Sequence, residues 1–298
     1  MPVPRSRKPG SLAASRPAGS RVSRRAKFAA ATSLPAVLAL LLALPGAASA
    51  APVPADPPQQ NVPTRGSAHM GMGVVEHDGQ GALPRGGDRV AQTEGVDVSS
   101  HQGNVDWQAL WNSGVSWAYV KATEGNYYKN TYFTQQYNGS YNVGMIRGTY
   151  HFGTPNDSSG ANQANYFVDG GGGWSPDGRT LPGVLDIEWN PYGATCYGKT
   201  QAQMVDWIRD FVNTYKARTG RDAVIYTATS WWKECTGNYG GFGATNPLWI
   251  ARYNTTVGEL PAGWGFQTIW QYTSTGPIVG DHNRFNGAYD RVQALANG

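Results

Sequence analysis

From about Thr93 to Gly298, short runs of apolar, β-branched and aromatic residues alternate with longer stretches whose apolar residues recur every three or four positions. The short runs are typical of strands, and the longer period is typical of amphipathic helices. The predicted strands cover residues 95–99, 117–122, 146–152, 183–187, 223–227, 248–253 and 268–272. Strands that alternate with helices favour a largely parallel sheet.

The clearest predicted helix runs from about Thr200 to Arg218, and Gly220 follows its end as a C-terminal signal. A second helix is predicted after Asn104, a residue type that caps helix N-termini. The face of this second helix that we expect to be buried carries Trp107, Leu110 and Trp111. Beyond Tyr253 the connections are too rich in Gly and Pro for full helices.

Seven or so strands with helices between the earlier ones predict an α/β fold, an irregular, flattened (β/α) barrel of the TIM-barrel type. Its last strands are expected to lack full helices. We assign it residues 93–298, a length near the low end for such barrels. A doubly wound open sheet is the alternative. No internal repeat or second domain is visible after residue 92.

The first fifty residues contain eight Lys or Arg and no acid, then an apolar run from Phe28 to Leu44 and the ending Ala48-Ser49-Ala50. This order is typical of a secretory signal peptide, so we predict cleavage after Ala50 and an extracellular protein. The pair Arg24-Arg25 leaves both the Sec and the Tat route open. A membrane anchor is the alternative, although the apolar run is shorter than the ~20 residues that a span requires.

Residues 51–92 are rich in Pro and Gly and poor in large apolar residues, which predicts a linker or an N-terminal arm. The stretch from Met72 to Glu76 is apolar enough to pack on another surface. The sequence gives no indication of what this segment does.

Removal of the predicted signal peptide reverses the net charge of the protein. The whole chain has 24 basic and 20 acidic residues, and eight of the basic ones lie in the first fifty positions. The remainder is therefore acidic by about four charges, and we expect no nucleic-acid partner, since that would require a basic stripe on the folded domain. We also expect no membrane partner after cleavage, and a monomer.

Only two cysteines occur, Cys196 and Cys235. In an exported protein this even count predicts one disulfide that closes a long loop. Two buried free thiols are the alternative.

Four acids lie where a barrel of this type carries its chemistry, at the carboxyl ends of strands. Asp97 lies inside the first predicted strand, Asp186 and Glu188 end another, and Asp281 follows the last strand and a loop. Asp186 and Glu188 face the same side because they are two residues apart on a strand. Two close carboxylates cannot both ionise cheaply, which provides the protonated acid that glycoside hydrolysis needs. An ion-paired strand end is the alternative, but these runs contain no Lys or Arg.

Aromatic residues are abundant, and several of the 27 Trp and Tyr residues lie at predicted strand ends. Flat rings with a polar tip suit sugar faces, although core packing explains any single ring as well. The candidates for sugar contact are Tyr119, Tyr150, Trp189, Tyr226, Tyr253 and Trp270. The five histidines show no metal-ligand spacing and no phosphate loop or nucleophile elbow is present, so we expect neither a metal nor a cofactor.

Five segments resemble the signatures of glycoside hydrolase family 25, the Chalaropsis-type lysozymes. They begin at Glu94 (EGVDVSSHQG), Val120 (VKATEG), Gly148 (GTYHF), Asp186 (DIE) and Trp270 (WQY). The resemblance covers about residues 93–298. It implies an N-acetylmuramidase that hydrolyses the β-1,4 bond between N-acetylmuramic acid and N-acetylglucosamine of peptidoglycan. Some family members also accept O-acetylated muramic acid.

The resemblance also implies roles for the candidate residues. Glu188 would be the general acid/base, and Asp186 would hold the substrate's acetamido group or stabilise the charged intermediate. Asp97 and Asp281 would complete an acidic floor, and Tyr150 would contact the sugar near the cleavage point. The motif does not decide between a covalent intermediate on Asp186 and assistance by the 2-acetamido group, and we favour the assisted route with retention. No wall-binding repeats are visible, so targeting would come from the substrate groove or the arm.

Three other functions compete with this hypothesis. A chitinase or endo-glucosaminidase would also end a strand in Asp-x-Glu, but usually with further acids where Val184 and Leu185 stand here. An inactive carbohydrate-binding protein would have no need to retain all four acids. A structural cell-wall protein would leave these acids without a purpose.

Overall fold

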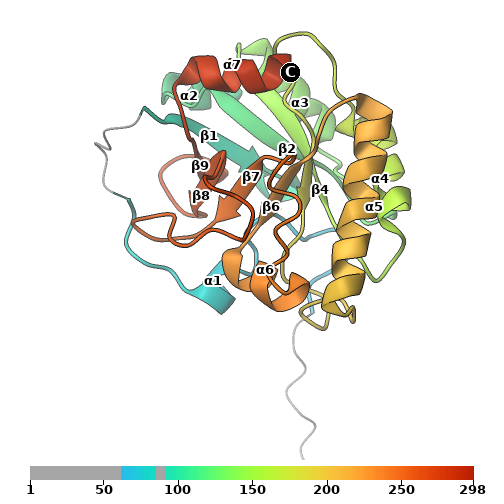
Figure 1. The fold of residues 1–298 in the computed structure, drawn as a ribbon. Helices are drawn as coiled ribbons and strands as arrows, with labels where there is room; N and C mark the ends of the chain where they lie inside the picture. Colours follow the sequence, from blue (N-terminus) through green and yellow to red (C-terminus); the bar gives the residue numbers. More distant parts are fainter. Residues whose placement is uncertain (1–61, 85–90) are drawn as a thin grey trace, which may run out of the picture. The chain divides into compact units, whose positions relative to one another are not determined.

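The structure is a computed structural model that describes residues 62–84 and 91–298. The predicted signal peptide lies outside the described residues. Eight strands close a barrel, which is the predicted α/β barrel and not an open doubly wound sheet (Figure 1). Closure comes from β1 (Thr93–Val98), which pairs in parallel with β2 (Trp117–Glu124) and antiparallel with β9 (Asp281–Phe285).

The remaining barrel strands follow in order between β2 and β9. They are β4 (Ile146–Phe152), β5 (Val184–Asp186), β6 (Val224–Thr227), β7 (Leu248–Ala251) and β8 (Ile269–Thr273). All neighbouring pairs from β1 through β2 and β4 to β8 are parallel. The short β3 (Tyr128–Lys129) extends β2 as an antiparallel hairpin outside the barrel. Parallel strands place their carboxyl ends at one end of the barrel, the end at which barrels of this type carry their active sites.

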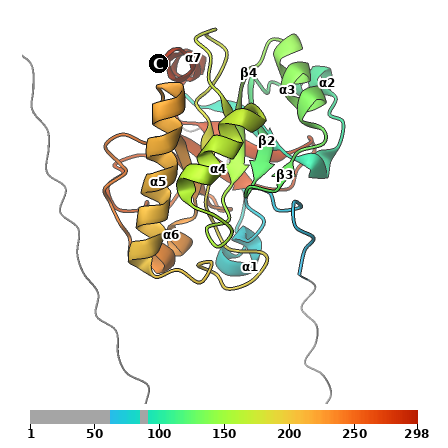
Figure 2. The ribbon, with the colours of Figure 1, turned by 90° about the vertical axis from the view of Figure 1, so that its right-hand side faces the viewer.

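Helices cover the outside of the barrel between the earlier strands (Figures 1 and 2). They are α2 (Trp107–Asn112), α3 (Phe133–Asn142), α4 (Gly160–Phe167), the π-helical turn η2 (Val168–Gly172), α5 (Gln201–Thr219) and α6 (Thr229–Thr236). The helix α7 (Tyr289–Asn297) lies at the amino end of the barrel. No helix lies within residues 252–268 or 274–280, as the Gly and Pro content of these connections predicts.

Successive side chains of β2 pack in two different apolar layers, so this strand is buried on both faces. Trp117 and Tyr119 pack in the barrel interior, whereas Ala118 and Val120 pack against the layer of α2 and α3. Successive side chains of a strand point to opposite faces, so Lys121 returns to the interior at the carboxyl end. The interior is therefore apolar at the amino end of β2 and polar at its carboxyl end.

The helix predicted near residues 200–218 is α5, and its ends follow the expected chemistry. Thr200 caps it in a capping box with Gln203, and Gly220 ends it in the left-handed conformation. The predicted cap of α2 was wrong. Asp106, not Asn104, accepts the hydrogen bond from the amide of Ala109.

Two further details differ from the sequence analysis. On α2, Trp107 and Leu110 are buried, but Trp111 is 38% exposed because it lies past the edge of the contact face. The strand β9 was missed because its sequence, Asp-His-Asn-Arg-Phe, has no apolar run. Its polar side chains are buried because several of them face the site described below.

Residues 62–84, called the arm from here on, pack on the carboxyl end of the barrel, opposite α7 (Figure 1). They contain the short helix α1 (Val74–Asp78). The side chains of Ala68, Met70 and Val74 are fully buried there. Within residues 62–84 and 91–298, no helix is long and apolar enough to span a membrane.

Candidate active site

The structure brings together the four acids that the sequence singled out. Asp97 precedes the last residue of β1, Asp186 ends β5, and Glu188 follows two residues later. Asp281 begins β9, and because β9 is antiparallel its first residue lies opposite Asp97 at the carboxyl end of the barrel. All four side chains are buried. The barrel therefore concentrates four carboxyl groups at one end.

Two amide side chains orient Asp97. Its Oδ2 accepts hydrogen bonds from Nδ2 of Asn283 (2.7 Å) and from Nε2 of Gln271 (2.9 Å). The same Gln271 amide also donates to Oδ2 of Asp281 at 3.3 Å. Burial raises the pKa of Asp97 to about 7, although both amides favour its charged form.

Asp186 and Glu188 form a buried acid pair. Burial raises the pKa of Glu188 to about 8, while burial and the charge of Glu188 raise the pKa of Asp186 well above its usual value. Among the described residues, neither oxygen of Asp186 nor Oε2 of Glu188 has a hydrogen-bond donor. A proton shared between the two carboxyl groups satisfies both. The pair therefore holds an exchangeable proton at neutral pH, as a general acid requires.

Asp281 extends the acidic floor. Burial raises its pKa well above the usual value, and the charges of Asp97 and Glu188 act in the same direction. Four buried carboxyl groups that interact in this way titrate as a set, so they cannot all be charged at neutral pH.

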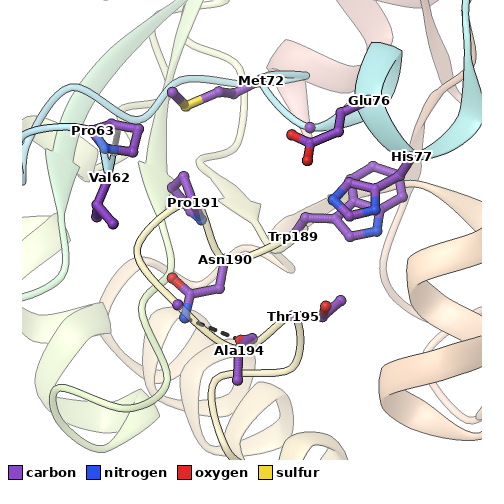
Figure 3. A pocket seen from close by; sticks show the side chains of 12 residues that line it. Val62, Pro63, Met72, Glu76, His77, Trp189, Asn190, Pro191, Ala194 and Thr195 are labelled. Carbon is purple, nitrogen blue, oxygen red and sulfur yellow. Dashed lines mark hydrogen bonds between the residues drawn. The ribbon is translucent and has the colours of Figure 1, made fainter. Parts of the chain in front are cut away.

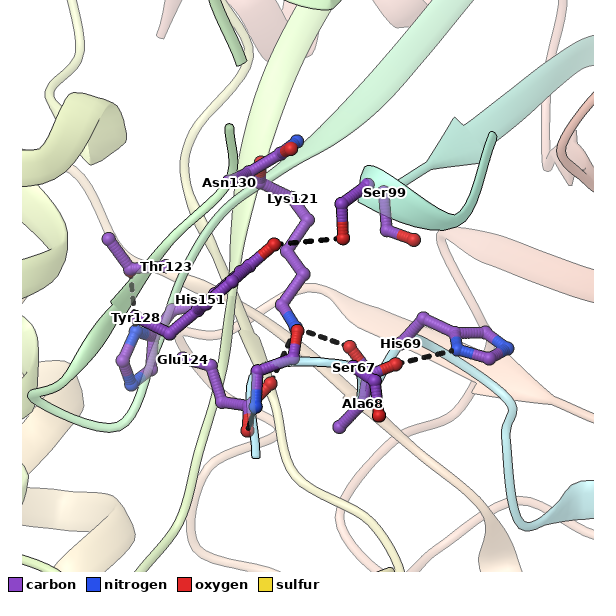
Figure 4. Close-up of polar contacts among 12 residues, drawn as sticks. Ser67, Ala68, His69, Ser99, Lys121, Thr123, Glu124, Tyr128, Asn130 and His151 are labelled. Atoms are coloured by element: carbon purple, nitrogen blue, oxygen red, sulfur yellow. Dashed lines mark hydrogen bonds and ion pairs between the residues drawn. The ribbon is translucent and has the colours of Figure 1, made fainter. Parts of the chain in front are cut away.

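A buried ion pair next to the acids was missed by the sequence analysis (Figure 4). Nζ of Lys121 lies 2.6 Å from Oε2 of Glu124, and both side chains are 0% exposed. Oε1 of Glu124 accepts hydrogen bonds from the hydroxyls of Tyr127 and Tyr192, each at 2.6 Å. The signal was present, since a Lys and a Glu inside an otherwise buried strand need partners.

Charges and burial oppose each other in this pair. Burial lowers the pKa of Lys121, and the charges of Glu124 and Asp186 only partly compensate. Burial alone would raise the pKa of Glu124, but the charge of Lys121 and the tyrosine hydroxyls hold it below the usual value. Glu124 is therefore an anion whose neighbours fix it in place.

Three of the predicted tyrosines lie at the acid cluster. The hydroxyls of Tyr226 and Tyr253 donate to Oε1 of Gln271 at 2.7 and 3.0 Å. The hydroxyl of Tyr150 is buried without a hydrogen-bond partner in the described chain, and burial and the charge of Asp97 raise its pKa. A polar group left unpaired beside catalytic-type acids is available to a ligand.

The other predicted aromatics lie in different places. Trp189 follows the acid pair and stacks on His77 of the arm. The Tyr119 hydroxyl donates to the carbonyl of Pro182, the second residue before β5, and so lies at the amino end of the barrel. Nε1 of Trp270 donates to the carbonyl of Arg252, on the side of β8 opposite Gln271. Tyr119 and Trp270 are therefore not brought to the acids.

A cavity of about 800 Å³ lies between the arm and the loop that follows Glu188 (Figure 3). It is lined by the arm residues Val62, Pro63, Met72, Gly73, Glu76 and His77 and by the loop residues Trp189, Asn190, Pro191, Gly193, Ala194 and Thr195. The four acids do not line this cavity. They lie beneath the arm, where the backbone N–H of Gly71 donates to Oε1 of Glu188 at 2.7 Å.

Cys196 and Cys235 form a disulfide, which confirms the prediction from the cysteine count. It ties the loop after Glu188 to α6. Across the described residues, the one group with metal-ligand spacing consists of these two cysteines and Glu234. Sulfurs joined in a disulfide are not thiolate ligands, so this group does not form a metal site.

Comparisons with known proteins agree with the geometry. The sequence profile described as "Glycosyl hydrolases family 25" matches residues 96–281. "Lysozyme M1" of Streptomyces globisporus is 46% identical over 290 residues, which is 94% of this chain and 99% of that one. An "N,O-diacetylmuramidase" of Chalaropsis sp is 44% identical over 69% of this chain and 99% of its own.

Solved structures show the same similarity. The muramidase from Acremonium alcalophilum is 54% identical and superposes with a TM-score of 0.68, over 69% of this chain and 99% of its own. That share of this chain is close to the length of the barrel, residues 93–298.

Proposed function

The chain belongs to glycosyl hydrolase family 25, and we propose that the acid cluster cleaves the β-1,4 bond between N-acetylmuramic acid and N-acetylglucosamine, with Glu188 as the general acid. The chain is a muramidase, a glycoside hydrolase that acts on bacterial peptidoglycan. The observation that carries the site assignment is the buried pair Asp186 and Glu188 at the end of β5, where raised pKa values retain a proton near neutral pH.

The proposed reaction has two steps and retains the anomeric configuration. In the first, Glu188 protonates the glycosidic oxygen, the C1–O bond breaks, and the carbonyl oxygen of the substrate's 2-acetamido group bonds to C1. Asp186 accepts the acetamido N–H and stabilises the positive charge that develops on that group. In the second, Glu188 takes a proton from water, and the water oxygen replaces the acetamido oxygen at C1.

The surrounding residues bind and orient the glycan in this proposal. Asp97 and Asp281 complete the polar floor, and Tyr150 offers its unpaired hydroxyl beside them. Tyr226, Tyr253 and Trp189 supply ring faces for the sugars. Tyr119 and Trp270 are not included because the structure places them away from the acids.

The organisation of the chain completes the proposal. We assign residues 1–50 to a signal peptide that exports the protein, residues 51–92 to an N-terminal segment that contains the arm, and residues 93–298 to the catalytic domain. The enzyme would act outside the cell as a monomer on peptidoglycan glycan strands.

The Glu188→Gln variant, made in a chain of residues 91–298 that lacks the arm, tests the assignment on purified Gram-positive cell walls. Loss of turnover with retained binding is expected, because an amide cannot donate the proton but keeps the shape. Glu259→Gln, a surface change on a half-exposed ion pair, is the matched control and should leave turnover intact. Unchanged turnover in Glu188→Gln would refute the assignment, and faster cleavage of chitin oligomers than of cell walls would favour a chitinase.

A further inference from the structure

The backbone of the arm contacts the proposed general acid directly. The Gly71 N–H donates to Oε1 of Glu188 at 2.7 Å. A Cβ on Gly71 would lie 2.5 Å from Oε1 of Gln271 and closer still to the hydroxyl of Tyr253, and Gly71 has a φ of +77°. Only glycine allows the chain to pass this close to the acids in this conformation.

The polar groups of the arm pair with the buried ion pair beside the acids (Figure 4). Nζ of Lys121 donates to the carbonyls of Gly66 (3.1 Å) and Ala68, and the N–H of Gly66 donates to Oε1 of Glu124 at 2.9 Å. The amides of Gly66 and Ala68 also donate to the hydroxyl of Tyr192. The arm thus satisfies polar groups that a polar ligand would otherwise engage.

An aromatic contact covers the remaining side of the site (Figure 3). The ring of His77 stacks on Trp189 with centroids 4.8 Å apart and planes 2° from parallel. Gly73 allows the arm to approach this indole, since a Cβ there would lie 2.9 Å from it. The face of Trp189 that we propose for a sugar is therefore occupied.

Contacts at both ends hold the arm across the site. Near its start, Arg65 forms an ion pair with Asp157 and stacks over Tyr127. Near its end, Oγ of Ser230 donates to Asp78 at 2.9 Å, and the amide of Gly81 donates to the carbonyl of Tyr253 at 2.7 Å. The arm therefore crosses the barrel end from the β2 and β4 side to the β6 and β7 side.

We propose that the arm is an intramolecular inhibitor that occupies the substrate site and keeps the full chain inactive until it is displaced or removed. This inference rests on the proposed function, because it requires that the glycan bind where Glu188, Trp189 and Tyr253 lie. The arm and a glycan cannot use these groups at the same time. The inhibitor is a segment of the same chain, so its effective concentration is on the order of millimolar.

The arm also acts on the charge state of Glu188. The N–H groups of Gly71 and Gly73 favour the charged form of Glu188 and so oppose the rise of its pKa that burial causes. The arm therefore disfavours the protonated form that a general acid needs.

We expect the barrel to fold without the arm, because the family profile matches residues 96–281 and so does not include it. The whole chain of the Acremonium alcalophilum muramidase matches a barrel-sized share of this chain. The alignment with Lysozyme M1 spans 290 residues and so extends beyond the barrel into the residues before it. A chain of residues 91–298 therefore serves as the reference for the uninhibited enzyme.

The first test compares full-length variants on cell walls. Gly71→Val introduces a side chain that has no space, and Met70→Glu places a charge in a fully buried position over the acids. Both should raise the rate at least tenfold towards that of residues 91–298. Val75→Glu adds the same charge at a position that is 47% exposed and should behave as wild type. Equal rates for wild type, both variants and residues 91–298 would overturn the inference.

The second test uses a synthetic peptide of residues 62–84 with the 91–298 chain. The peptide should inhibit by raising KM without lowering kcat, and the same peptide with Gly71→Val should be at least tenfold weaker. If the peptide binds with a Kd of about 10 µM, the tethered arm should inhibit about 100-fold. Absence of peptide binding by calorimetry would overturn the inference. A further outcome is that the 91–298 chain binds the wild-type peptide but not the Gly71→Val peptide, and yet hydrolyses no peptidoglycan. That result would support the inference that the arm occupies the site beside Glu188, and it would refute the proposed function.

Discussion

Nδ2 of Asn283 donates to Oδ2 of Asp97 over 2.7 Å, across the strand pair β9 and β1. The orientation of this amide is fixed, because Oδ1 of Asn283 accepts the indole N–H of Trp249 at 2.9 Å and an indole can only donate. The NH₂ group must then face Asp97. A tryptophan in the barrel core thus sets the hydrogen bonding of a residue in the acidic floor.

The first prediction concerns the pKa of Asp97. Asn283→Leu removes a hydrogen bond to its charged form, so the pKa should rise above about 7, by about 1 to 2 pH units for a bond to a charged group. Carboxyl ¹³C NMR titration measures this shift. Asn286→Leu is the control, since Nδ2 of Asn286 bonds the carbonyl of Gln267 and not an acid. An unchanged pKa of Asp97 in the Asn283→Leu variant would show that the Asn283 amide does not control this pKa.

The second prediction concerns stability against pH. The pKa values of Asp97 and Glu188 are raised to about 7 and about 8, so the folded state keeps protons that the unfolded state loses above about pH 4. The free energy of unfolding therefore falls as pH rises from about 4 to 8. His69 and His151, whose pKa values are lowered to about 4 by burial, oppose this fall below about pH 6.5.

The fall should therefore be steepest between about pH 6.5 and 8, at up to about 1.4 kcal/mol per pH unit for each acid until the pH passes the folded-state pKa of that acid, about 7 for Asp97 and about 8 for Glu188. Urea unfolding at several pH values measures it, with Asp97→Asn as the variant that should flatten the slope. A slope that is unchanged in Asp97→Asn, or stability that rises over this range, would contradict the assignment of raised pKa values.

The parallel strands β1, β2 and β4 to β8 were predictable because their side chains are largely apolar on both faces, and burial on both faces is what a parallel barrel imposes. The position of Asp186 and Glu188 at the carboxyl end of the barrel was predictable for a related reason, since both follow an apolar run that forms a parallel strand. Their spacing of two residues also indicated that they face the same side. These features lie within short stretches of the chain, so they can be recognised from one sequence.

What escaped prediction depends on contacts that are distant in sequence. The arm approaches the barrel closely at glycines such as Gly71, where the contacts come from the backbone. Such contacts give the sequence of the arm no hydrophobic periodicity that would predict them. Lys121 and Glu124 form their pair across a strand end and are completed by Tyr192, 68 residues from Glu124. Tyr119 and Trp270 lie near the ends of predicted strands. In the structure, however, the Tyr119 hydroxyl lies at the amino end of the barrel, and Trp270 lies on the side of β8 opposite Gln271, so neither faces the acids.

The third prediction concerns the buried ion pair. Lys121→Met leaves Glu124 charged and buried without its cation, which should lower the free energy of unfolding by about 3 to 5 kcal/mol. The double variant Lys121→Met with Glu124→Gln should recover part of this loss because no charge is left unpaired. Urea unfolding of the single and double variants measures the coupling.

A surface pair provides the control for that experiment. Lys233 and Glu259 are also 2.6 Å apart, but their side chains are 42% and 70% exposed. Lys233→Met should cost about 0 to 1 kcal/mol because solvent screens the charges. Similar losses for Lys121→Met and Lys233→Met would mean that burial does not strengthen the inner pair.

The fourth prediction concerns the disulfide between Cys196 and Cys235, which are 39 residues apart. A cross-link of this length restricts the unfolded chain, so replacing both cysteines by serine should lower the free energy of unfolding by about 4 kcal/mol. The disulfide also anchors the loop that carries Trp189 to α6, whereas Glu188 lies only two residues after the end of β5. In chains of residues 91–298, the double variant should therefore raise KM for cell walls more than it lowers kcat. Reduced wild type is the control and should match the variant in both properties. A variant with lower kcat and unchanged KM would instead place the effect of the disulfide on the acids.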